Sequence, residues 1–209
     1  EEVAVKYKIS REDQDEFSYQ SHQKAVQAIK NGKFKNQIVP FEVEKVDFDA
    51  STQKRVTSSY TVNTDEGPRI DTSIEALGKL KPAFKNGGTV TAGNSSQTSD
   101  GAAFVLIMSE KLVKQLNLEP QARLLSCVSV GVHPRYMGIG PMVAIPRALE
   151  KAQLTLNDID QIELNEAFAS QSLACMEELH LNEEIVNVNG GSIAIGHPLG
   201  ASGTRIATT

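Results

Sequence analysis

A glycine-rich stretch near the end of the sequence holds the side chain with the most evident chemical use, His197. This stretch, residues 187–203, has the sequence N-V-N-G-G-S-I-A-I-G-H-P-L-G-A-S-G and contains five glycines. Glycine lets the backbone approach a ligand closely or take a positive φ, and it is otherwise costly inside regular structure. A residue before proline is biased away from the α region, so we expect His197 on a non-helical turn just before a helix. Such a histidine can face a ligand, but a βα turn with an incidental histidine accounts for the same pattern.

A second polar position, Asn165, follows a short apolar run at 162–164 and precedes a stretch expected to be helical. Ligand-facing polar groups in α/β folds commonly occupy this place, after a strand and before a helix. An N-cap role would explain Asn165 equally well. A similar polar turn, Gly93-Asn-Ser-Ser96, precedes another apolar run. The two turns are therefore candidate ligand-facing positions.

Several familiar catalytic motifs are absent from the sequence. There is no G-x-S-x-G elbow of a serine hydrolase and no G-x-x-x-x-G-K-[ST] phosphate loop. Gly138-Ile-Gly140 lacks the third glycine of a dinucleotide fingerprint. None of the four histidines has an H-E-x-x-H or C-x-x-C companion, so we predict no metal site.

The composition is that of a globular protein, with 40% hydrophobic and 22% charged residues among 209. No apolar run approaches the roughly 18 residues that span a bilayer, so we expect no membrane segment. The formal net charge of −5 argues against non-specific binding to nucleic acid, which needs a basic surface. Two cysteines, Cys127 and Cys175, fit a reducing compartment and no disulfide framework. Because the chain begins without a secretory signal, we expect a cytoplasmic protein.

Capping residues and hydrophobic periodicity predict five helices and an exposed β-ribbon. Ser10 followed by Asp13 resembles a capping box, and no Gly or Pro occurs before Gly32, so a helix of about twenty residues is expected there. Partial alternation at 37–49 and 55–62 predicts the ribbon. The other expected helices are 73–80, 110–117, 141–152 and 166–181.

The remaining apolar runs are predicted to be strands. Residues 102–108 are apolar at every position, as in a strand that is covered on both faces. The other expected strands are 89–96, 123–132, 161–164 and 186–195. The resulting β-α-β-α-β order in the second half predicts a layered α/β fold, with a mostly parallel mixed sheet covered by helices.

Seven ordered blocks together resemble the thiolase family, and the resemblance covers nearly all of the chain. They are S-R-E-D-Q-D-E-F at 10–17, K-P-A-F at 81–84, T-V-T-A-G-N at 89–94, S-D-G-A at 99–102, M-G-I-G-P at 137–141, N-E-A-F at 165–168 and G-G-S-I-A-I-G-H-P at 190–198. The resemblance implies thiolysis of a 3-oxoacyl-CoA to acetyl-CoA and a shortened acyl-CoA, or the reverse Claisen condensation. It also implies an incomplete copy of a thiolase-like α/β fold, with coenzyme A as a substrate and no permanently bound cofactor.

The resemblance assigns roles to individual residues. His197 corresponds to the histidine of the family's G-H-P motif, which helps to activate the nucleophilic cysteine and donates to an oxyanion hole. An imidazole suits both roles because its proton affinity lies near neutrality. Asn165 corresponds to the asparagine that holds a water in that oxyanion hole. The residues implied to contact CoA are Ser96 at the pantetheine, Phe84, Ala92, Met137 and Phe168 in an apolar tunnel, and Arg69 at the nucleotide.

The resemblance also implies a division of the chain and an assembly. Residues 1–70 would belong to a loop excursion that covers CoA, 71–119 to the end of the first thiolase half, and 120–209 to a truncated second half. The implied partners are acyl-CoA and CoA substrates and further copies of the chain, as homodimers or homotetramers. Organellar targeting stays open, since its signals lie at termini that this chain is expected to lack.

One departure from the family pattern concerns cysteine. Thiolases use a nucleophilic cysteine in the first half and a second cysteine in a C-x-G turn, and neither motif occurs here. Cys127 lies in an apolar run and Cys175 on the helix face of Leu179, so both are predicted to be small buried hydrophobes. Covalent acyl transfer without a thiolate has no nucleophile. We therefore expect an internal piece of a thiolase that is inactive alone.

Two other hypotheses remain. A thiolase-like acyl-CoA-binding or scaffold protein would keep the groove without catalysis, although it would need neither His197 nor Asn165. A hydrolase that pairs Ser96 or Ser202 with His197 would lack a carboxylate placed by the sequence to orient the imidazole. Sequence beyond both ends would separate the scaffold from the catalytic piece, because only the latter needs flanking cysteine motifs.

Overall fold

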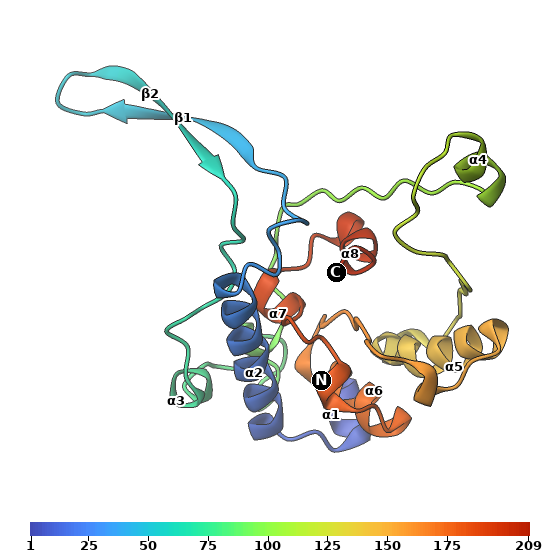
Figure 1. The fold of residues 1–209 in the computed structure, drawn as a ribbon. Helices are drawn as coiled ribbons and strands as arrows, with labels where there is room; N and C mark the ends of the chain where they lie inside the picture. The colour runs from blue at the N-terminus through green and yellow to red at the C-terminus, as the bar shows by residue number, and fades with distance from the viewer.

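The structure, a computed structural model, describes residues 1–209 and has a helical body from which a two-stranded arm and a long loop extend (Figure 1). The α-helices are α1 Glu2–Tyr7, α2 Arg11–Lys30, α3 Ile74–Gly78, α4 Glu110–Gln115, α5 Gly140–Ala152, α6 Ala169–Leu179, α7 Ser192–Ile195 and α8 Leu199–Ile206. The 3-10 helices are η1 Ala92–Asn94, η2 Pro134–Ile139, η3 Leu156–Asp158 and η4 Glu183–Ile185, and the strands are β1 Phe41–Asp49 and β2 Lys54–Val62. None of the helices is both long and apolar enough to cross a membrane.

Helix α2 begins where its local sequence signals predict. The Ser10 side chain accepts from the Asp13 N–H at 3.0 Å, and the Asp13 carboxylate accepts from the Ser10 N–H. This capping box confirms the predicted start, and Asn31 is the C-cap at the predicted end. Helix α2 contacts α3, α6, α7 and η1, so it joins segments that are far apart in the sequence.

The buried face of α2 is largely polar, and its side chains bind other segments of the chain. Ser21 Oγ donates to Glu166 at 2.7 Å, across 145 residues of sequence. His22 Nδ1 accepts from the Arg69 N–H at 3.1 Å. Buried polar groups require such partners, and here the partners fix α2 against the turns that carry the candidate site.

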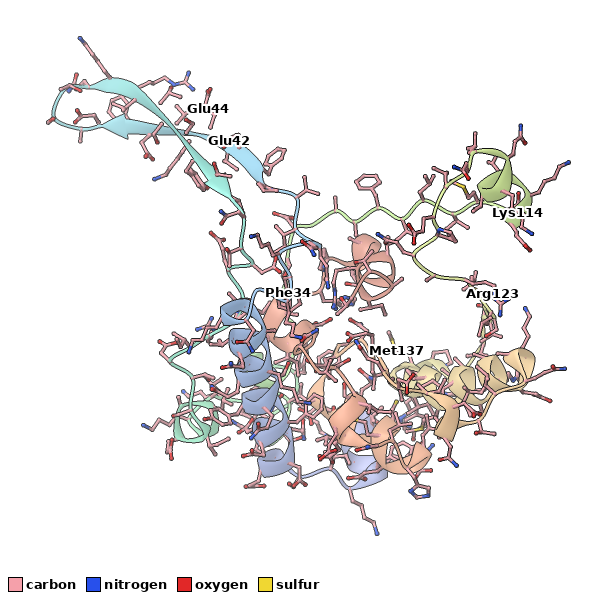
Figure 2. All side chains as sticks on the ribbon, in the orientation of Figure 1. Phe34, Glu42, Glu44, Lys114, Arg123 and Met137 are labelled. Carbon is pink, nitrogen blue, oxygen red and sulfur yellow. The ribbon has the colours of Figure 1, made fainter.

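Strands β1 and β2 form an antiparallel arm that projects from the body (Figure 1). The register pairs Asp49 with Lys54 at the turn, where the Asp49 carboxylate also accepts from the Ser51 N–H at 2.8 Å. Most arm residues are exposed, and Figure 2 shows Glu42 and Glu44 on the arm, away from the helical body. The predicted exposed ribbon is thereby confirmed.

Helix α6 lies between two apolar clusters that form the core of the body. One cluster consists of Leu164, Cys175, Met176, Leu181 and Val186. The other consists of Val3, Ile9 and Ala174. Because α6 contributes to both, it holds α1 and the segments before and after itself in one packed unit.

The predictions of strands at 102–108 and 123–132 are wrong for this chain. Both runs are drawn out in Figure 1 without a strand partner, and the one regular sheet is the β1–β2 arm. Of the expected parallel sheet, the structure contains a single bridge between Ile162 and Val186. A strand requires a neighbour for its backbone groups, and no strand within these residues pairs with either run. Their apolar side chains are consequently exposed, with Phe104 at 90%.

The two cysteines differ in their surroundings. Cys175 is buried in the α6 core, as predicted, and burial raises the pKa of its thiol to about 11. Cys127 was predicted to be buried but is exposed. Its run, 123–132, has no strand partner and hydrogen-bonds only to α5, through Ser126 and the Cys127 carbonyl, which leaves the Cys127 side chain exposed.

Two further runs predicted to be strands, 89–96 and 186–195, contain turns and short helices. In the first, Asn94 Oδ1 accepts from the Thr91 N–H at 2.7 Å, which closes a capping box and starts η1. In the second, Gly190 has a φ of 80°, which turns the chain out of an extended path before α7. Local side-chain hydrogen bonds and glycine therefore prevail over the apolar pattern.

Burial of His22 makes folding stability depend on pH. Burial and the neighbouring Arg69 charge lower the pKa of His22 from 6.5 to about 4. Above pH 6.5 both states are neutral; between pH 6.5 and 4 the unfolded chain takes up the proton first, so stability falls as pH falls. We expect the free energy of unfolding to fall by up to about 3 kcal/mol between pH 6.5 and 4, and to fall less in the His22→Gln variant. Denaturant unfolding at pH 7 and 4.5 measures it, and equal pH dependence in both proteins would contradict this prediction.

Candidate functional site

Three segments far apart in the sequence meet around His197. The His197 N–H donates to the Gln97 carbonyl at 3.2 Å, which joins the G-H-P turn to the polar turn after η1. The Ser96 N–H donates to the Ala167 carbonyl at 3.0 Å, which joins the same polar turn to the N-E-A-F segment. The backbone therefore brings together the three turns that the sequence marked as candidate ligand-facing positions.

His197 is held in its turn by the residues on both sides. Gly196 has a φ of 102°, a conformation that favours glycine, and it ends α7. Pro198 is the N-cap of α8, so His197 lies on a non-helical turn before a helix, as predicted. The imidazole is half-buried, with Nδ1 2.6 Å from Ser202 Oγ and Nε2 3.4 Å from Asn165 Nδ2.

Asn165 does not cap the following helix, because α6 has Phe168 as its N-cap. Its position is fixed by Asn187, whose amide accepts from the Leu164 N–H and donates to the Leu164 carbonyl, each at 2.8 Å. Ser192 Oγ donates to Asn165 Oδ1 at 2.6 Å. The N-cap interpretation is therefore wrong, and the amide is directed at His197 instead.

A buried carboxylate, Glu166, supports this pair and was missed by sequence reasoning. It is 1% exposed and accepts from Ser21 Oγ at 2.7 Å, Asn187 Nδ2 at 2.8 Å and the Ile193 N–H at 3.2 Å. Burial raises the pKa of Glu166, while these donors act in the opposite direction. A Cβ at Gly191 would overlap the carboxyl group, so the glycine allows the turn to lie against it. The N-E-A-F and G-G letters were the only sequence signal, and they do not reveal their mutual contact.

The residues predicted to contact CoA are only partly brought together. Phe84 and Phe168 make an edge-to-face contact with ring centroids 5.7 Å apart, and they are 65% and 37% exposed. Ser95 forms an antiparallel bridge with Phe168, and the Ser96 N–H donates to the Ala167 carbonyl, so Ser96 lies against the backbone just before Phe168. Ala92 is exposed in η1, a few residues earlier in the same turn.

Met137 and Arg69 lie apart from the hydrogen bonds of the site. Met137 is 78% exposed in η2. Figure 2 shows it close to α5. Arg69 is exposed, and its backbone N–H donates to His22 on α2. Neither residue hydrogen-bonds to His197 or Asn165, so their roles in CoA binding stay predictions.

An open cavity of about 430 Å³ adjoins the His197 turn. Its walls are residues 99–103 and 198–201, which are the chain after Gln97 and the start of α8. Gly101 approaches Pro198 so closely that a Cβ there would press on the proline ring. The cavity lies against the residues that follow His197, and a bound molecule can lie in it.

The geometry does not favour the hydrolase hypothesis. Ser202 contacts His197 but is 3% exposed, which leaves no access for a substrate. Nε2 of His197 faces an amide rather than a carboxylate, and Ser96 makes no hydrogen bond to the ring. No group of three His, Cys, Asp or Glu side chains is placed to hold a metal ion.

Two family models together match nearly the whole chain. The model for the thiolase N-terminal domain matches residues 1–111, and that for the thiolase C-terminal domain matches residues 118–209. The chain belongs to the thiolase family. It is 52% identical over 206 residues to the 3-ketoacyl-CoA thiolase of Bacillus subtilis, a match that covers 99% of this chain and 52% of the relative.

Solved thiolase structures are similar over 98% of the chain. The acetyl-CoA acetyltransferase of Bacillus anthracis has a TM-score of 0.88 at 45% identity, with 50% of that chain covered. The dimeric peroxisomal thiolase of Saccharomyces cerevisiae has a TM-score of 0.87 at 43% identity, with 49% covered. Human mitochondrial 3-ketoacyl-CoA thiolase in complex with CoA has a TM-score of 0.84 at 44% identity, with 48% covered.

These comparisons confirm the predicted family and the thiolase-like α/β fold. The chain spans about half the length of the relatives it matches. Its backbone therefore follows the thiolase fold even where runs such as 102–108 have no strand partner among these residues. The division at residues 70 and 119 stays a prediction.

Proposed function

We propose that this chain carries the histidine–asparagine half of a thiolase active site, which transfers acyl groups between CoA thioesters. The reaction is thiolysis of a 3-oxoacyl-CoA to acetyl-CoA and a shortened acyl-CoA, or the reverse Claisen condensation. The observation that carries the proposal is the approach of His197 Nε2 to Asn165 Nδ2 at 3.4 Å, on turns fixed by other segments, in a chain of the thiolase family.

The chemistry of this pair fits that reaction. An imidazole near neutrality accepts a thiol proton and, once protonated, donates to a developing oxyanion. The Asn165 amide has two donors, so one can face His197 while the other holds a water or the substrate oxygen. Donors directed at the place where charge develops are the main source of stabilisation in acyl transfer.

We propose that the nucleophilic thiolate comes from thiolase residues outside these 209. Cys175 is fully buried, and its raised pKa of about 11 disfavours the thiolate. Cys127 is exposed, but its carbonyl binds Lys151 of α5 and its run has no hydrogen bond to the His197 turn. The same outside residues would cover the exposed apolar runs 102–108 and 123–132 by strand pairing.

The proposal predicts that the isolated chain is inactive and that a complete context makes it active. The test compares the isolated chain with a chimera in which residues 1–209 replace the matched 206 residues of the Bacillus subtilis enzyme. We expect CoA-dependent cleavage of acetoacetyl-CoA by the chimera only. Turnover by the isolated chain would contradict the missing nucleophile, and a folded, inactive chimera would favour the scaffold alternative.

Coenzyme A is the proposed substrate, and the chimera is proposed to be a homodimer or homotetramer. The human neighbour is a complex with CoA, and the yeast neighbour is dimeric. The exposed pair Phe84–Phe168 supplies an apolar surface for a pantetheine, and Ser96, on the segment bridged to Phe168, supplies a hydroxyl. Ala92, Met137 and Arg69 are proposed as further contacts. Sedimentation of the chimera tests the assembly.

Ser96→Ala is expected to weaken CoA binding by about 1 kcal/mol, the usual contribution of one neutral hydrogen bond. The Ser96 hydroxyl makes no hydrogen bond within the chain, so it is available to a ligand and its loss should not destabilise the fold. Titration calorimetry with CoA on the chimera and on its Ser96→Ala variant measures the change. An unchanged affinity would contradict the role of Ser96.

A further inference from the structure

The hydrogen bonds around His197 form one directed chain, from the Arg205 guanidinium to the Pro198 carbonyl. We propose that this series of hydrogen bonds fixes the Nδ1–H tautomer of His197, with Ser192 and Ser202 as the positioning residues. The links run from Arg205 to Ser192, Ser192 to Asn165, Asn165 to His197, His197 to Ser202 and Ser202 to Pro198. The direction is set at both ends, because a guanidinium can only donate and a carbonyl can only accept.

Ser192 determines which way the Asn165 amide faces. Arg205 Nη2 lies 3.5 Å from Ser192 Oγ and can only donate, so the Ser192 proton is free for Asn165. The separation of 2.6 Å between Ser192 and Asn165 matches an O–H···O bond and is short for N–H···O. The Asn165 atom at Ser192 is therefore Oδ1, which leaves Nδ2 facing Nε2 of His197 at 3.4 Å.

An amide N–H directed at Nε2 requires a lone pair on that nitrogen, so the ring proton of neutral His197 lies on Nδ1. Nδ1–H then donates to Ser202 Oγ at 2.6 Å, and the Ser202 hydroxyl donates to the Pro198 carbonyl at 3.1 Å. Ser202 is 3% exposed, so bulk water does not compete for these bonds. The opposite tautomer would place two N–H donors face to face at Nε2.

These hydrogen bonds leave Nε2 unprotonated, with its single lone pair facing the Asn165 amide across a long contact of 3.4 Å, so this contact must be released when the nitrogen accepts a proton. The consequence for the reaction rests on the proposed function, in which this nitrogen takes the thiol proton. Ser192 and Ser202 act through Asn165 and His197 rather than on a substrate. Their effect is to hold the ring in the tautomer that can act as a base.

The tautomer can be measured in the chain itself by ¹⁵N and ¹³C NMR with labelled histidine rings. A ring nitrogen gives a different ¹⁵N signal when it is protonated and when it is bare, and His197→Gln identifies the His197 signals by their loss. At a pH where the ring is neutral, we expect a protonated Nδ1 and a bare Nε2. A protonated Nε2 as the main species would overturn the assignment.

Variants test the two serines. Ser202→Ala and Ser192→Ala should each shift His197 towards Nε2–H, whereas Ser202→Thr keeps the hydroxyl and should keep Nδ1–H. The matched control is Ser18→Ala, because buried Ser18 donates to the carbonyl four residues earlier, that of Gln14, at 2.7 Å and has no hydrogen bond to His197 or to its partners. The His197 signals should not change in this control.

The outcomes separate this inference from the proposed function. Unchanged tautomer populations in both alanine variants would overturn the role of the serines. If the isolated protein shows the Nδ1–H signal but the folded chimera is inactive, the result would count against the proposed function alone. If Ser202→Ala does not fold, two measurements still test the inference. The unmodified protein must show Nδ1–H, and Ser192→Ala must shift the population towards Nε2–H; the opposite result in either protein would contradict it.

Discussion

Replacement of His197 by alanine in the chimera is expected to lower formation of the acyl-enzyme by at least about 10⁴-fold. One side chain is proposed both to take the thiol proton and to donate to the oxyanion. Loss of a general base costs about 10²- to 10⁴-fold, and loss of one oxyanion donor about 10²- to 10³-fold. The effect should appear in the rate rather than in CoA affinity, because His197 is not among the residues that are proposed to contact CoA.

The measurement is acyl transfer from acetyl-CoA to the chimera's cysteine, followed by mass spectrometry in single turnover. The control is His133→Ala, because His133 is exposed and its ring accepts only from the Arg135 N–H in its own turn. This variant should be labelled at the unmodified rate. Near-normal labelling of His197→Ala would refute the assignment of His197 as the base.

The elements that the sequence predicts correctly are those whose signals are local. The Ser10–Asp13 capping box, the break at Gly32 and the alternation of the arm act within a few residues, and each was found where expected. Helix α5 also appears over nearly the predicted range. Such features form through neighbouring backbone and side-chain groups, so a window of sequence contains their cause.

The strands at 102–108 and 123–132 could not be judged in the same way. An apolar run indicates that a layer should cover it, but it does not say whether that layer is part of the chain. The pairing partner of a parallel strand lies far away in sequence. The polar buried face of α2 presents the same difficulty, because Ser21 is explained by Glu166 and the Gly191 N–H, 145 and 170 residues later.

In the candidate site, too, residues with local signals were predicted and residues that depend on distant contacts were not. His197 and Asn165 were singled out by glycine, proline and position after an apolar run, and the structure places them 3.4 Å apart. Glu166, Ser192 and Ser202 were not selected as supporting residues, although all three are buried and hydrogen-bonded beside that pair. A serine or glutamate has no distinctive local signature when its role depends on contacts made after folding.

Gly191→Ala is expected to destabilise the chain by about 2.5 to 6 kcal/mol, the sum of about 1–3 for overpacking and about 1.5–3 for a lost hydrogen bond to a charged group. The backbone is not the cause, because Gly191 has a φ of −127°, which any residue adopts. A Cβ there would overlap the Glu166 carboxyl group, which is held by Ser21, Asn187 and the Ile193 N–H. The added methyl group must displace that carboxylate from its donors.

Denaturant unfolding of the isolated chain measures this effect, with Gly203→Ala as the matched control. A Cβ at Gly203 meets no atom within 4 Å, and the residue lies within α8. Gly203→Ala should therefore be neutral or stabilise by up to about 1 kcal/mol, the difference in helix propensity. A similar loss of stability in both variants would show that glycine at 191 is not required by a contact.

The decisive comparison is made in a Glu166→Ala background, where the obstructing carboxyl group is gone. Glu166→Ala is itself destabilising because Ser21, Asn187 and the Ile193 N–H lose their acceptor. Gly191→Ala should then add little, so the double variant should be more stable than the sum of the single effects by most of the about 2.5 to 6 kcal/mol that Gly191→Ala costs alone. Additive effects would exclude the overlap as the cause. Coupling of this size would instead establish that the glycine before α7 is needed so that a buried carboxylate can hold the His197 turn in place.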